Sequence, residues 1–351
     1  MPVAVRFAPY HLPLHPPFAV GDHKLEERRG LIVELRAEEF CGYGDVAPLP
    51  GLHRESLREV RDHLKALSDV DDHESLAEFA SSLDDTLPPS LRFGLESAWL
   101  GLAAARRGVA PANLLDPMPR PEVQINGLLD VGLRGARRAL EAGDLARYPT
   151  IKVKVGRRSL EEEHALLALL VAELPAGVRL RLDGNRRMDL ADACALLDGT
   201  DPGRIDWIEE PLRDPSELGK LYDHTGVRLA LDESLQDQDD AETWRRGIAA
   251  WVAKPGVARA LQGTMELGRR AADAGLVVVV SSSLESGLGL WSLATLAACL
   301  NAEPVAAGLG TDRWLASDII DPPFTSTEGA VALTDAVLQP SAEAWPPDEE
   351  H

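Results

Sequence analysis

The most constraining feature of this sequence is a repeated alternation, after Pro111, of short apolar stretches with longer stretches that have the spacing of amphipathic helices. The short stretches cover residues 123–127, 150–156, 178–185, 205–211, 227–234, 250–256, 276–283 and 305–310. Strands that alternate with helices pair in parallel, because each helix returns the chain to the same edge of the sheet. The alternation therefore predicts a (β/α)8 barrel, with a doubly wound open sheet as the alternative.

The segments on either side of this repeat have different patterns. Residues 1–50 alternate apolar and polar positions between glycines and prolines, which is typical of a small antiparallel sheet. From Arg54 to Arg107 the apolar residues recur at helical spacing. We therefore expect an α+β capping domain over residues 1–115, a barrel over 116–311, a return of the chain to the capping domain over 312–345, and a frayed tail over 346–351.

Composition excludes several classes of partner. The chain has 351 residues and a net charge of −21, which disfavours nucleic acids and anionic membrane surfaces. Cys41, Cys194 and Cys299 lie far apart, so neither a disulfide framework nor a zinc ribbon is indicated. The first twenty residues contain no unbroken apolar run, and no later run is long enough to span a bilayer. We expect a cytoplasmic protein.

Ionisable side chains stand at the carboxyl ends of five consecutive predicted strands. They are Lys152 and Lys154 on the first of these strands, followed by Asp183, Glu209, Asp232 and Lys254. Barrel strands are buried on both faces and are expected to be apolar, whereas barrel enzymes carry their catalytic groups at the carboxyl ends of the strands. The pattern therefore predicts that these side chains gather on one rim of the barrel.

Asp183, Glu209 and Asp232 follow three successive strands. Carboxylates that converge on one point repel each other unless a cation lies between them. A ligand set made only of oxygen favours Mg²⁺, with Mn²⁺ as a possible substitute. Each residue taken alone fits an ordinary cap of a strand–helix loop, but the ordered set predicts a divalent metal site.

The lysines suit acid–base chemistry. Lys152 and Lys154 are two positions apart on a strand, so their side chains share a face. Two neighbouring ammonium groups lower each other's proton affinity, which favours a neutral lysine that acts as a base. Lys254 ends an apolar run across the rim, where it can be a second acid–base group or stabilise negative charge. The alternative is that these are solvated loop lysines.

Two stretches rich in serine or glycine follow the last two predicted strands. SSSLESG (281–287) begins a predicted helix, so its backbone N–H groups and hydroxyls can bind a substrate carboxylate, and GLG (308–310) occupies the equivalent place one strand later. The sequence has no P-loop, G-x-S-x-G or H-E-x-x-H motif, and GLGTDR lacks the third glycine of a dinucleotide fingerprint. We expect a small-molecule carboxylate substrate, and the oligomeric state is not indicated.

The ordered motifs K-x-K, D-x-N, I-E-E-P, D-E-S and K-P-G resemble those of the enolase superfamily, muconate-lactonizing subgroup. The resemblance covers nearly the whole chain and includes GYGDVAPLPG (42–51), RFGLESAW (92–99), SSSLESGLG (281–289) and GLGTD (308–312). It implies a TIM-like barrel with a capping domain. It also implies Mg²⁺ ligation by Asp183, Glu209 and Asp232, beside a lysine base, as is general for enolase-superfamily sites.

For the lysines, the resemblance implies separate roles. Lys154 would remove the proton next to the substrate carboxylate and then protonate the departing hydroxide on the same face. Lys152 would support Lys154 electrostatically, and Lys254 would stabilise the enediolate from the opposite face. The fuller set of motifs resembles members that dehydrate 2-succinyl-6-hydroxy-2,4-cyclohexadiene-1-carboxylate to 2-succinylbenzoate in menaquinone biosynthesis. The implied activity is that of a magnesium-dependent lyase.

The resemblance also implies the surroundings of the substrate. Ser281 and Gly308 would contact its succinyl carboxylate. Asn185 and Glu233 would contact the metal ligands without binding the metal themselves. Asn185 would also contact the substrate. Residues 16–20 and 48–53 would close over the pocket as a lid.

Two other functions remain open. One is an N-succinylamino acid racemase or another epimerase of the same subgroup, because lysines on two faces also suit 1,1-proton transfer. The other is a non-catalytic metal-binding barrel. The three carboxylates and three lysines place like charges close together, which costs stability. A barrel without activity has no physical reason to keep them, so they argue against this function.

Overall fold

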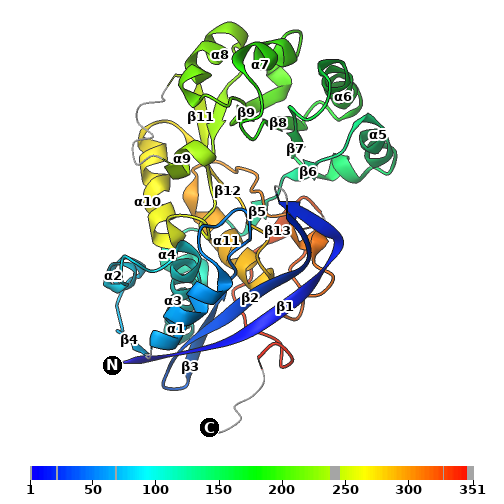
Figure 1. The fold of residues 1–351 in the computed structure, drawn as a ribbon. Helices are drawn as coiled ribbons and strands as arrows, with labels where there is room; N and C mark the ends of the chain where they lie inside the picture. The colour runs from blue at the N-terminus through cyan, green and yellow to red at the C-terminus, as the bar shows by residue number, and fades with distance from the viewer. Residues whose placement is uncertain (1, 21–22, 68, 238–245, 327, 346–351) are drawn as a thin grey trace.

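The computed structural model describes residues 2–20, 23–67, 69–237, 246–326 and 328–345 (Figure 1). The N-terminal part forms an antiparallel sheet with strand order β3-β2-β1-β4. Its strands are β1 (Val3–Val20), β2 (His23–Ala37), β3 (Phe40–Val46) and β4 (Asp69–Val70). The antiparallel sheet predicted from residues 1–50 is therefore confirmed.

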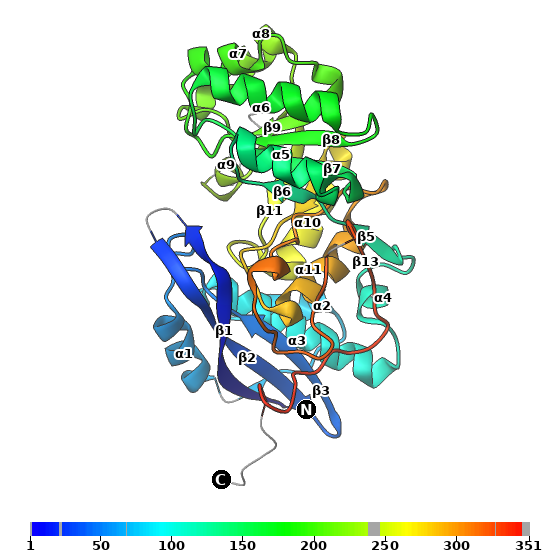
Figure 2. The same ribbon diagram turned by 90° about the vertical axis from the view of Figure 1, so that its right-hand side faces the viewer.

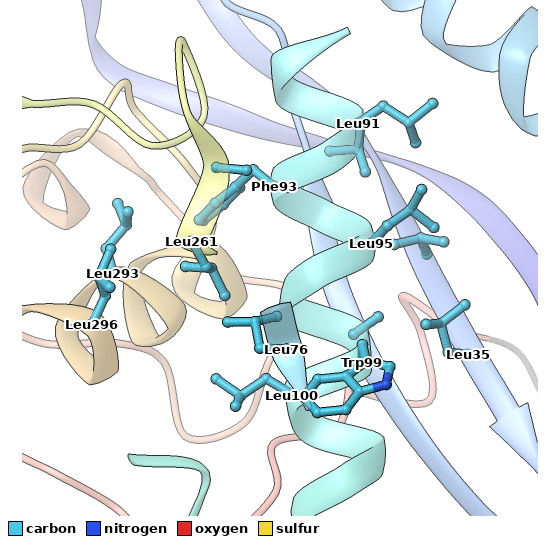
Figure 3. Packing of buried hydrophobic residues seen from close by; sticks show 14 of the residues in the cluster. Leu35, Leu76, Leu91, Phe93, Leu95, Trp99, Leu100, Leu261, Leu293 and Leu296 are labelled. Carbon is cyan, nitrogen blue, oxygen red and sulfur yellow. The ribbon is translucent and has the colours of Figure 1, made fainter. Parts of the chain in front are cut away.

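Helix α3 (Pro89–Arg107) is the centre of the N-terminal core (Figure 3). Leu35 of β2 packs on one side of α3, and Leu261, Leu293 and Leu296 of the barrel pack on another (Figure 3). The other helices here are α1 (Leu57–Ala66), α2 (Leu76–Ser82) and α4 (Pro111–Leu115). One apolar cluster therefore joins the capping sheet to the barrel.

The glycines of the G-Y-G motif allow α3 to lie directly on β3. A Cβ atom at Gly42 would be 2.1 Å from the carbonyl oxygen of Ala98, and one at Gly44 would be 1.9 Å from that of Gly94. Backbone cannot yield to such a contact, so any larger residue at either position would push the helix off the sheet. Part of the sequence resemblance noted above thus reflects packing.

The parallel sheet of the barrel has strand order β12-β11-β10-β9-β8-β7-β6. Its strands are β6 (Gly127–Leu129), β7 (Thr150–Lys154), β8 (Arg179–Asp183), β9 (Ile205–Glu209), β10 (Leu229–Leu231), β11 (Ile248–Ala253) and β12 (Val277–Val280). Residues 305–310 close the ring through parallel bridges from Ala307 to Ile125 and from Gly308 to Ser281. The predicted barrel is confirmed, and the open-sheet alternative is wrong.

Helices lie outside this sheet (Figures 1 and 2). They are α5 (Leu133–Glu141), α6 (Leu160–Glu173), α7 (Leu190–Leu197), α8 (Leu218–Thr225), α9 (Glu233–Asp237), α10 (Ala260–Asp273) and α11 (Gly287–Leu300), with short 3₁₀ turns at Asp144–Arg147, Pro202–Arg204, Pro215–Glu217 and Asp312–Trp314. Ser159 and Glu162 form a capping box at the start of α6. Every helix within the described ranges is too short or too polar to cross a bilayer.

Two expected strands differ in the structure. The run predicted at 123–127 is divided, because β5 (Glu122–Gln124) pairs antiparallel with β13 (Ala330–Ala332), while β6 begins only at Gly127. The division occurs where Ile125 N–H donates to the carbonyl of Gly329 and Asn126 N–H donates to that of Ala307. The strand-like run of the C-terminal segment therefore pairs beside the barrel, and not with the N-terminal sheet.

The last described residues do reach the N-terminal sheet. Leu338 and Trp345 pack against the cluster that contains Tyr10, Ile32 and Tyr43, and the rings of Trp345 and Tyr43 are 5.6 Å apart. The domain limits themselves stay a prediction, and the tail expected to fray, residues 346–351, lies outside the described residues.

Glu96 joins α3 to the start of α10. Its Oε2 accepts the backbone N–H of Gln262 at 2.8 Å. Burial raises the pKa of Glu96 to about 7, although the N–H donors of Gln262 and Leu261 and the charge of Arg92 act against it. The folded protein therefore holds this proton at a pH where the unfolded chain has lost it.

We expect Glu96→Gln to flatten the pH dependence of stability. A raised pKa gives stability that is complete below the unfolded pKa and is lost as pH rises through about 7. Urea unfolding at pH 5 and pH 8 should show that wild type loses about 2 kcal/mol more than the variant over this interval. Glu173→Gln, at an exposed position of α6, is the control. An equal loss of unfolding free energy between pH 5 and pH 8 in wild type and in Glu96→Gln would contradict the raised pKa of Glu96.

Candidate active site

Strand register brings the expected rim residues side by side. Lys154 at the end of β7 pairs with Asp183 at the end of β8, which pairs with Glu209 at the end of β9. Asp232 follows β10 directly, and Lys254 follows β11 directly. Parallel strands end at a common edge, so the predicted rim forms without any help from the loops.

Lysine and carboxylate groups pair closely across this rim. The Nζ atom of Lys152 lies 2.8 Å from Oδ2 of Asp183 and 2.8 Å from Oε1 of Glu209. Lys154 Nζ donates to Asp183 Oδ2 at 2.6 Å. Across the rim, Lys254 Nζ donates to Oδ2 of Asp232.

The charge states follow from these pairs. Burial lowers the pKa of Lys152, but the charges of Asp183 and Glu209 outweigh burial and raise it above its ordinary value. The expectation that the lysine pair would depress its own pKa is therefore wrong for Lys152 in the protein alone, because its nearest charges are carboxylates. Burial also opposes ionisation of Asp183, yet Lys152 and Lys154 hold its pKa below the usual range.

The negative charge of Glu209 is less well compensated than that of Asp183. Burial, followed by the charge of Asp183, raises the pKa of Glu209 to about 8, against the effect of Lys152. A buried carboxylate in this condition gains from any additional positive charge.

The donor set fits a hard divalent cation. The side chains of Asp183, Glu209 and Asp232 are almost fully buried at adjacent strand ends, and each offers carboxylate oxygen. In the described ranges no three carboxylate, imidazole or thiol groups already stand at metal-ligand spacing. In the pairs above, lysine ammonium groups lie against these carboxylates. The metal role of the three carboxylates stays a prediction.

Asn185 and Glu233 extend the site behind Lys154. The Nζ of Lys154 donates to Oδ1 of Asn185 at 2.8 Å, and Asn185 Nδ2 donates to Oε1 of Glu233 at 3.4 Å. The Oε2 atom of Glu233 is buried with no hydrogen-bond partner among the described residues. Asn185 therefore helps to fix the position of the Lys154 amine, together with Asp183.

Ser281 and Gly308 lie next to each other, as the closing bridge of the barrel requires. A Cβ atom at Gly308 would be 2.9 Å from the Oγ of Ser281, so glycine leaves room for that hydroxyl. Their expected contact with a substrate carboxylate stays a prediction.

The expectation that the helix start at 281–287 offers free N–H groups is wrong for five of them. The N–H of Ser281 donates to the carbonyl of Ala253, and that of Ser282 donates to the carbonyl of Gly308. The N–H of Ser283 donates to Glu285, that of Ser286 to Asp45, and that of Gly287 to Asp318. Helix α11 begins only at Gly287, and protein carboxylates already satisfy its first donors.

The two predicted lid segments lie together over one side of the barrel. Phe18 from residues 16–20, and Leu49 and Leu52 from residues 48–53, belong to an apolar cluster with Leu284 and Trp314. The rings of Phe18 and Trp314 are 5.0 Å apart, edge to face. Closing and opening of this cover remain a prediction.

Glu210 is a site residue that the sequence reasoning missed. Its Oε1 accepts the backbone N–H groups of Asp232 at 3.0 Å and Ser234 at 2.7 Å. Its Oε2 accepts from Arg186 Nε at 3.0 Å and from the hydroxyl of Ser234. Asn185, Arg186 and Glu210 all have positive φ, which indicates that this rim holds backbone strain. In the sequence, the signal for Glu210 was its place as the second glutamate of I-E-E-P. An interpretation that considers only metal ligands assigns no role to this glutamate.

We expect Glu210→Gln to weaken Mg²⁺ binding by about 10- to 100-fold, because an amide cannot accept at both ends as the carboxylate does. The midpoint of Mg²⁺-dependent thermal stabilisation measures this shift without any need for turnover. Glu217→Gln, on a surface 3₁₀ turn, provides the control. An unchanged midpoint in Glu210→Gln would show that the contact to Asp232 does not support a metal.

Family models match both parts of the chain. The model described as "MenC, N-terminal domain" matches residues 4–102, and "Enolase C-terminal domain-like" matches residues 133–337. Proteins named o-succinylbenzoate synthase from Yersinia pseudotuberculosis serotype O:1b (strain IP 31758) and from Yersinia pestis are each 31% identical over 89% of this chain and 91% of their own length.

Solved structures agree with the fold. The N-succinyl Arg/Lys racemase from Bacillus cereus ATCC 14579 superposes with a TM-score of 0.85 at 17% identity, over 98% of this chain and 97% of that one. The muconate lactonizing enzyme from Pseudomonas fluorescens, complexed with muconolactone, gives 0.83 at 20% identity with the same coverage. At such identities the likeness shows architecture alone.

Proposed function

This chain belongs to the o-succinylbenzoate synthase family of the enolase superfamily, and on that premise we propose that it converts 2-succinyl-6-hydroxy-2,4-cyclohexadiene-1-carboxylate to 2-succinylbenzoate in menaquinone biosynthesis. The observation that carries the proposal is the rim on which three lysines face three buried carboxylates. A lysine base beside a divalent cation suits removal of a proton next to a carboxylate.

Asp183, Glu209 and Asp232 are proposed to hold Mg²⁺, which Mn²⁺ can replace. When bound, the cation supplies Lewis acidity that polarises the substrate carboxylate and acidifies the adjacent C–H bond. With positive charge from a cation beside Asp183, Lys154, which donates to Asp183 in the structure, would be the residue able to act as a neutral amine. Asn185 accepts from the Lys154 amine and would keep it in place.

Lys154 then performs both proton transfers. As a neutral amine it removes the proton from the carbon that bears the carboxylate. The electrons of the C–H bond first form the enediolate of the substrate carboxylate. They then become the new ring double bond as the C–O bond breaks, and the Lys154 ammonium returns its proton to the leaving oxygen. One water is released and the ring becomes aromatic. One amine serves both transfers, so the elimination is syn. Lys254 stabilises developing negative charge from the other side of the rim.

A racemase is the second candidate, and one observation favours it. Lys154 and Lys254 pair with different carboxylates, Asp183 and Asp232, on separate strands. Two amines on opposite sides of one carbon can exchange a proton between its two faces. The proposed dehydration uses only one of them for proton transfer.

Separate assays with each substrate distinguish the candidates. The protein with added Mg²⁺, or with the chelator EDTA, is given either the cyclohexadiene carboxylate or an N-succinylamino acid. We expect aromatic absorbance to rise with the first substrate, and only with Mg²⁺. A change of optical rotation with the second substrate alone would replace the synthase by a racemase. Thermal stabilisation by Mg²⁺ without turnover of either substrate would indicate a binding protein.

A further inference from the structure

Arg28 of β2 is a buried arginine whose hydrogen bonds connect three parts of the chain. It is 1% exposed. Its Nε donates to the carbonyl of Leu284 at 2.7 Å, and its Nη1 donates to the carbonyl of Pro48 at 3.1 Å. Its Nη2 donates to the carbonyl of Ala47. One guanidinium thus joins the capping sheet to the loops 47–53 and 281–287.

Both loops held by Arg28 flank Lys254. On one side, Ser281 N–H donates to the carbonyl of Ala253, the residue before Lys254, at 2.8 Å. On the other side, Nε2 of His53 lies 3.0 Å from the carbonyl of Gly256, two residues after Lys254. The Nδ1 of His53 accepts the N–H of Leu49 at 2.9 Å, so Nε2 carries the proton and donates to Gly256.

The capping sheet holds the loop 281–287 at a second point. Asp45 of β3 is 1% exposed. Its Oδ2 accepts both the N–H and the hydroxyl of Ser286 at 2.8 Å, and its Oδ1 accepts the hydroxyl of Tyr10 at 2.7 Å. Leu284, the residue held by Arg28, has φ of +66°, a conformation that a leucine keeps only when its surroundings impose it.

A lysine could not replace this arginine. Carbonyl groups in three directions require the fixed fork of a guanidinium, whereas an ammonium on a flexible chain would leave at least one of them unpaired. Buried carbonyls that lose a partner are costly, so the loops would rearrange to reach water.

We infer that Arg28 is a positioning residue through which the capping sheet sets the placement of Lys254, by fixing the loops 47–53 and 281–287 on either side of it. The inference deepens the proposed function, because Lys254 is assigned to charge stabilisation there. It makes the N-terminal sheet part of the catalytic apparatus, and not only a cover for the barrel.

Hydrogen–deuterium exchange on the intact protein tests the inference without reference to any substrate. Arg28→Lys should raise amide exchange about tenfold or more in the peptides covering 47–53 and 281–287, with β7 to β9 unchanged. Arg29→Lys is the matched control, because Arg29 is exposed on the same strand and pairs with Glu27. Unchanged exchange in both loops, or a rise spread over the whole barrel, would overturn the positioning role.

Kinetics give a second readout. With the cyclohexadiene carboxylate, Arg28→Lys should lower kcat about tenfold, while the Mg²⁺ concentration for half-maximal thermal stabilisation stays at the wild-type value, because the carboxylates lie on other strands. If the wild-type protein does not turn over this substrate, the proposed function is refuted. The hydrogen–deuterium exchange result then decides alone whether Arg28 is a positioning residue.

His53→Leu covers the case in which Arg28→Lys does not fold. This substitution affects a partly exposed loop residue and removes only the bond to Gly256 and the turn contact to Leu49. Exchange should then rise in 254–258 while 281–287 stays protected. Unchanged exchange in 254–258 would refute the link from the loop to Lys254.

Discussion

Replacing Lys154 by alanine should reduce turnover of the cyclohexadiene carboxylate by a factor of about 1,000 or more while Mg²⁺ binding is retained. General acid–base catalysis by one positioned group contributes about 100- to 10,000-fold, and Lys154 is assigned two consecutive proton transfers. Among the described residues, the neighbouring amine of Lys152 is not placed to substitute for it, because it is paired with Asp183 and Glu209. The absorbance assay measures kcat, and thermal stabilisation by Mg²⁺ measures metal binding on the same sample.

Lys220→Ala is the control for this experiment. Lys220 lies on the surface of α8 and pairs only with Glu217 among the contacts described, so its loss should leave kcat unchanged. Turnover in Lys154→Ala within tenfold of wild type would remove Lys154 from the mechanism. A parallel loss of Mg²⁺-dependent stabilisation would instead show that the variant has lost the site as a whole.

The barrel and its rim could be predicted because both depend on local pattern. Runs whose strands end in a charged residue, such as 178–185 and 205–211, need only parallel pairing to bring Asp183 and Glu209 together, and the observed register does this directly. Boundaries were less predictable where one run serves two sheets, as at β5 and β6, because tertiary pairing decides which neighbour each N–H finds.

Buried polar residues were the main failure of pattern reasoning. Arg181 stands in the middle of β8, where an apolar residue was expected, and it is 4% exposed. Its guanidinium lies 4.3 Å from the ring of Trp207 and donates to the carbonyl of Ala306 at 2.6 Å. Partners such as these come from strands far apart in the sequence. Arg28, Asp45 and Glu210 were missed for the same reason, since the groups that they bind lie far from them in the chain.

The charge balance of the rim was also not predictable from strand ends. Three carboxylates in series indicated a cation, and in the structure lysines from the same rim provide the positive charge. Spacing shows which residues meet at an edge, but the side-chain pairs that form there depend on distances of a few ångströms. Because the lysines and carboxylates of the rim are paired, removing one carboxylate also leaves lysines without a counter-charge.

Asp183→Asn should abolish thermal stabilisation by Mg²⁺. In wild type, a ligand at 100 times its Kd stabilises the folded state by about 2.7 kcal/mol, which is a shift of several degrees in Tm. Asparagine offers a neutral oxygen where the site needs charge, and Asp183 is the carboxylate whose pKa the lysines hold below the usual range. Differential scanning fluorimetry with increasing Mg²⁺ measures the effect, and Mn²⁺ should behave alike.

The same variant should be less stable than wild type even without metal, which separates it from a simple loss of ligand. Asp183 accepts from both Lys152 and Lys154, so asparagine leaves two largely buried ammonium groups short of a counter-charge. Breaking a buried pair costs about 3 kcal/mol. Asp189→Asn makes the same change at the N-cap of α7, where asparagine caps as well as aspartate. That control should keep both its baseline Tm and its Mg²⁺ shift. Full Mg²⁺ stabilisation in Asp183→Asn would mean that the cation binds elsewhere, and the assignment of all three carboxylates would fall with it.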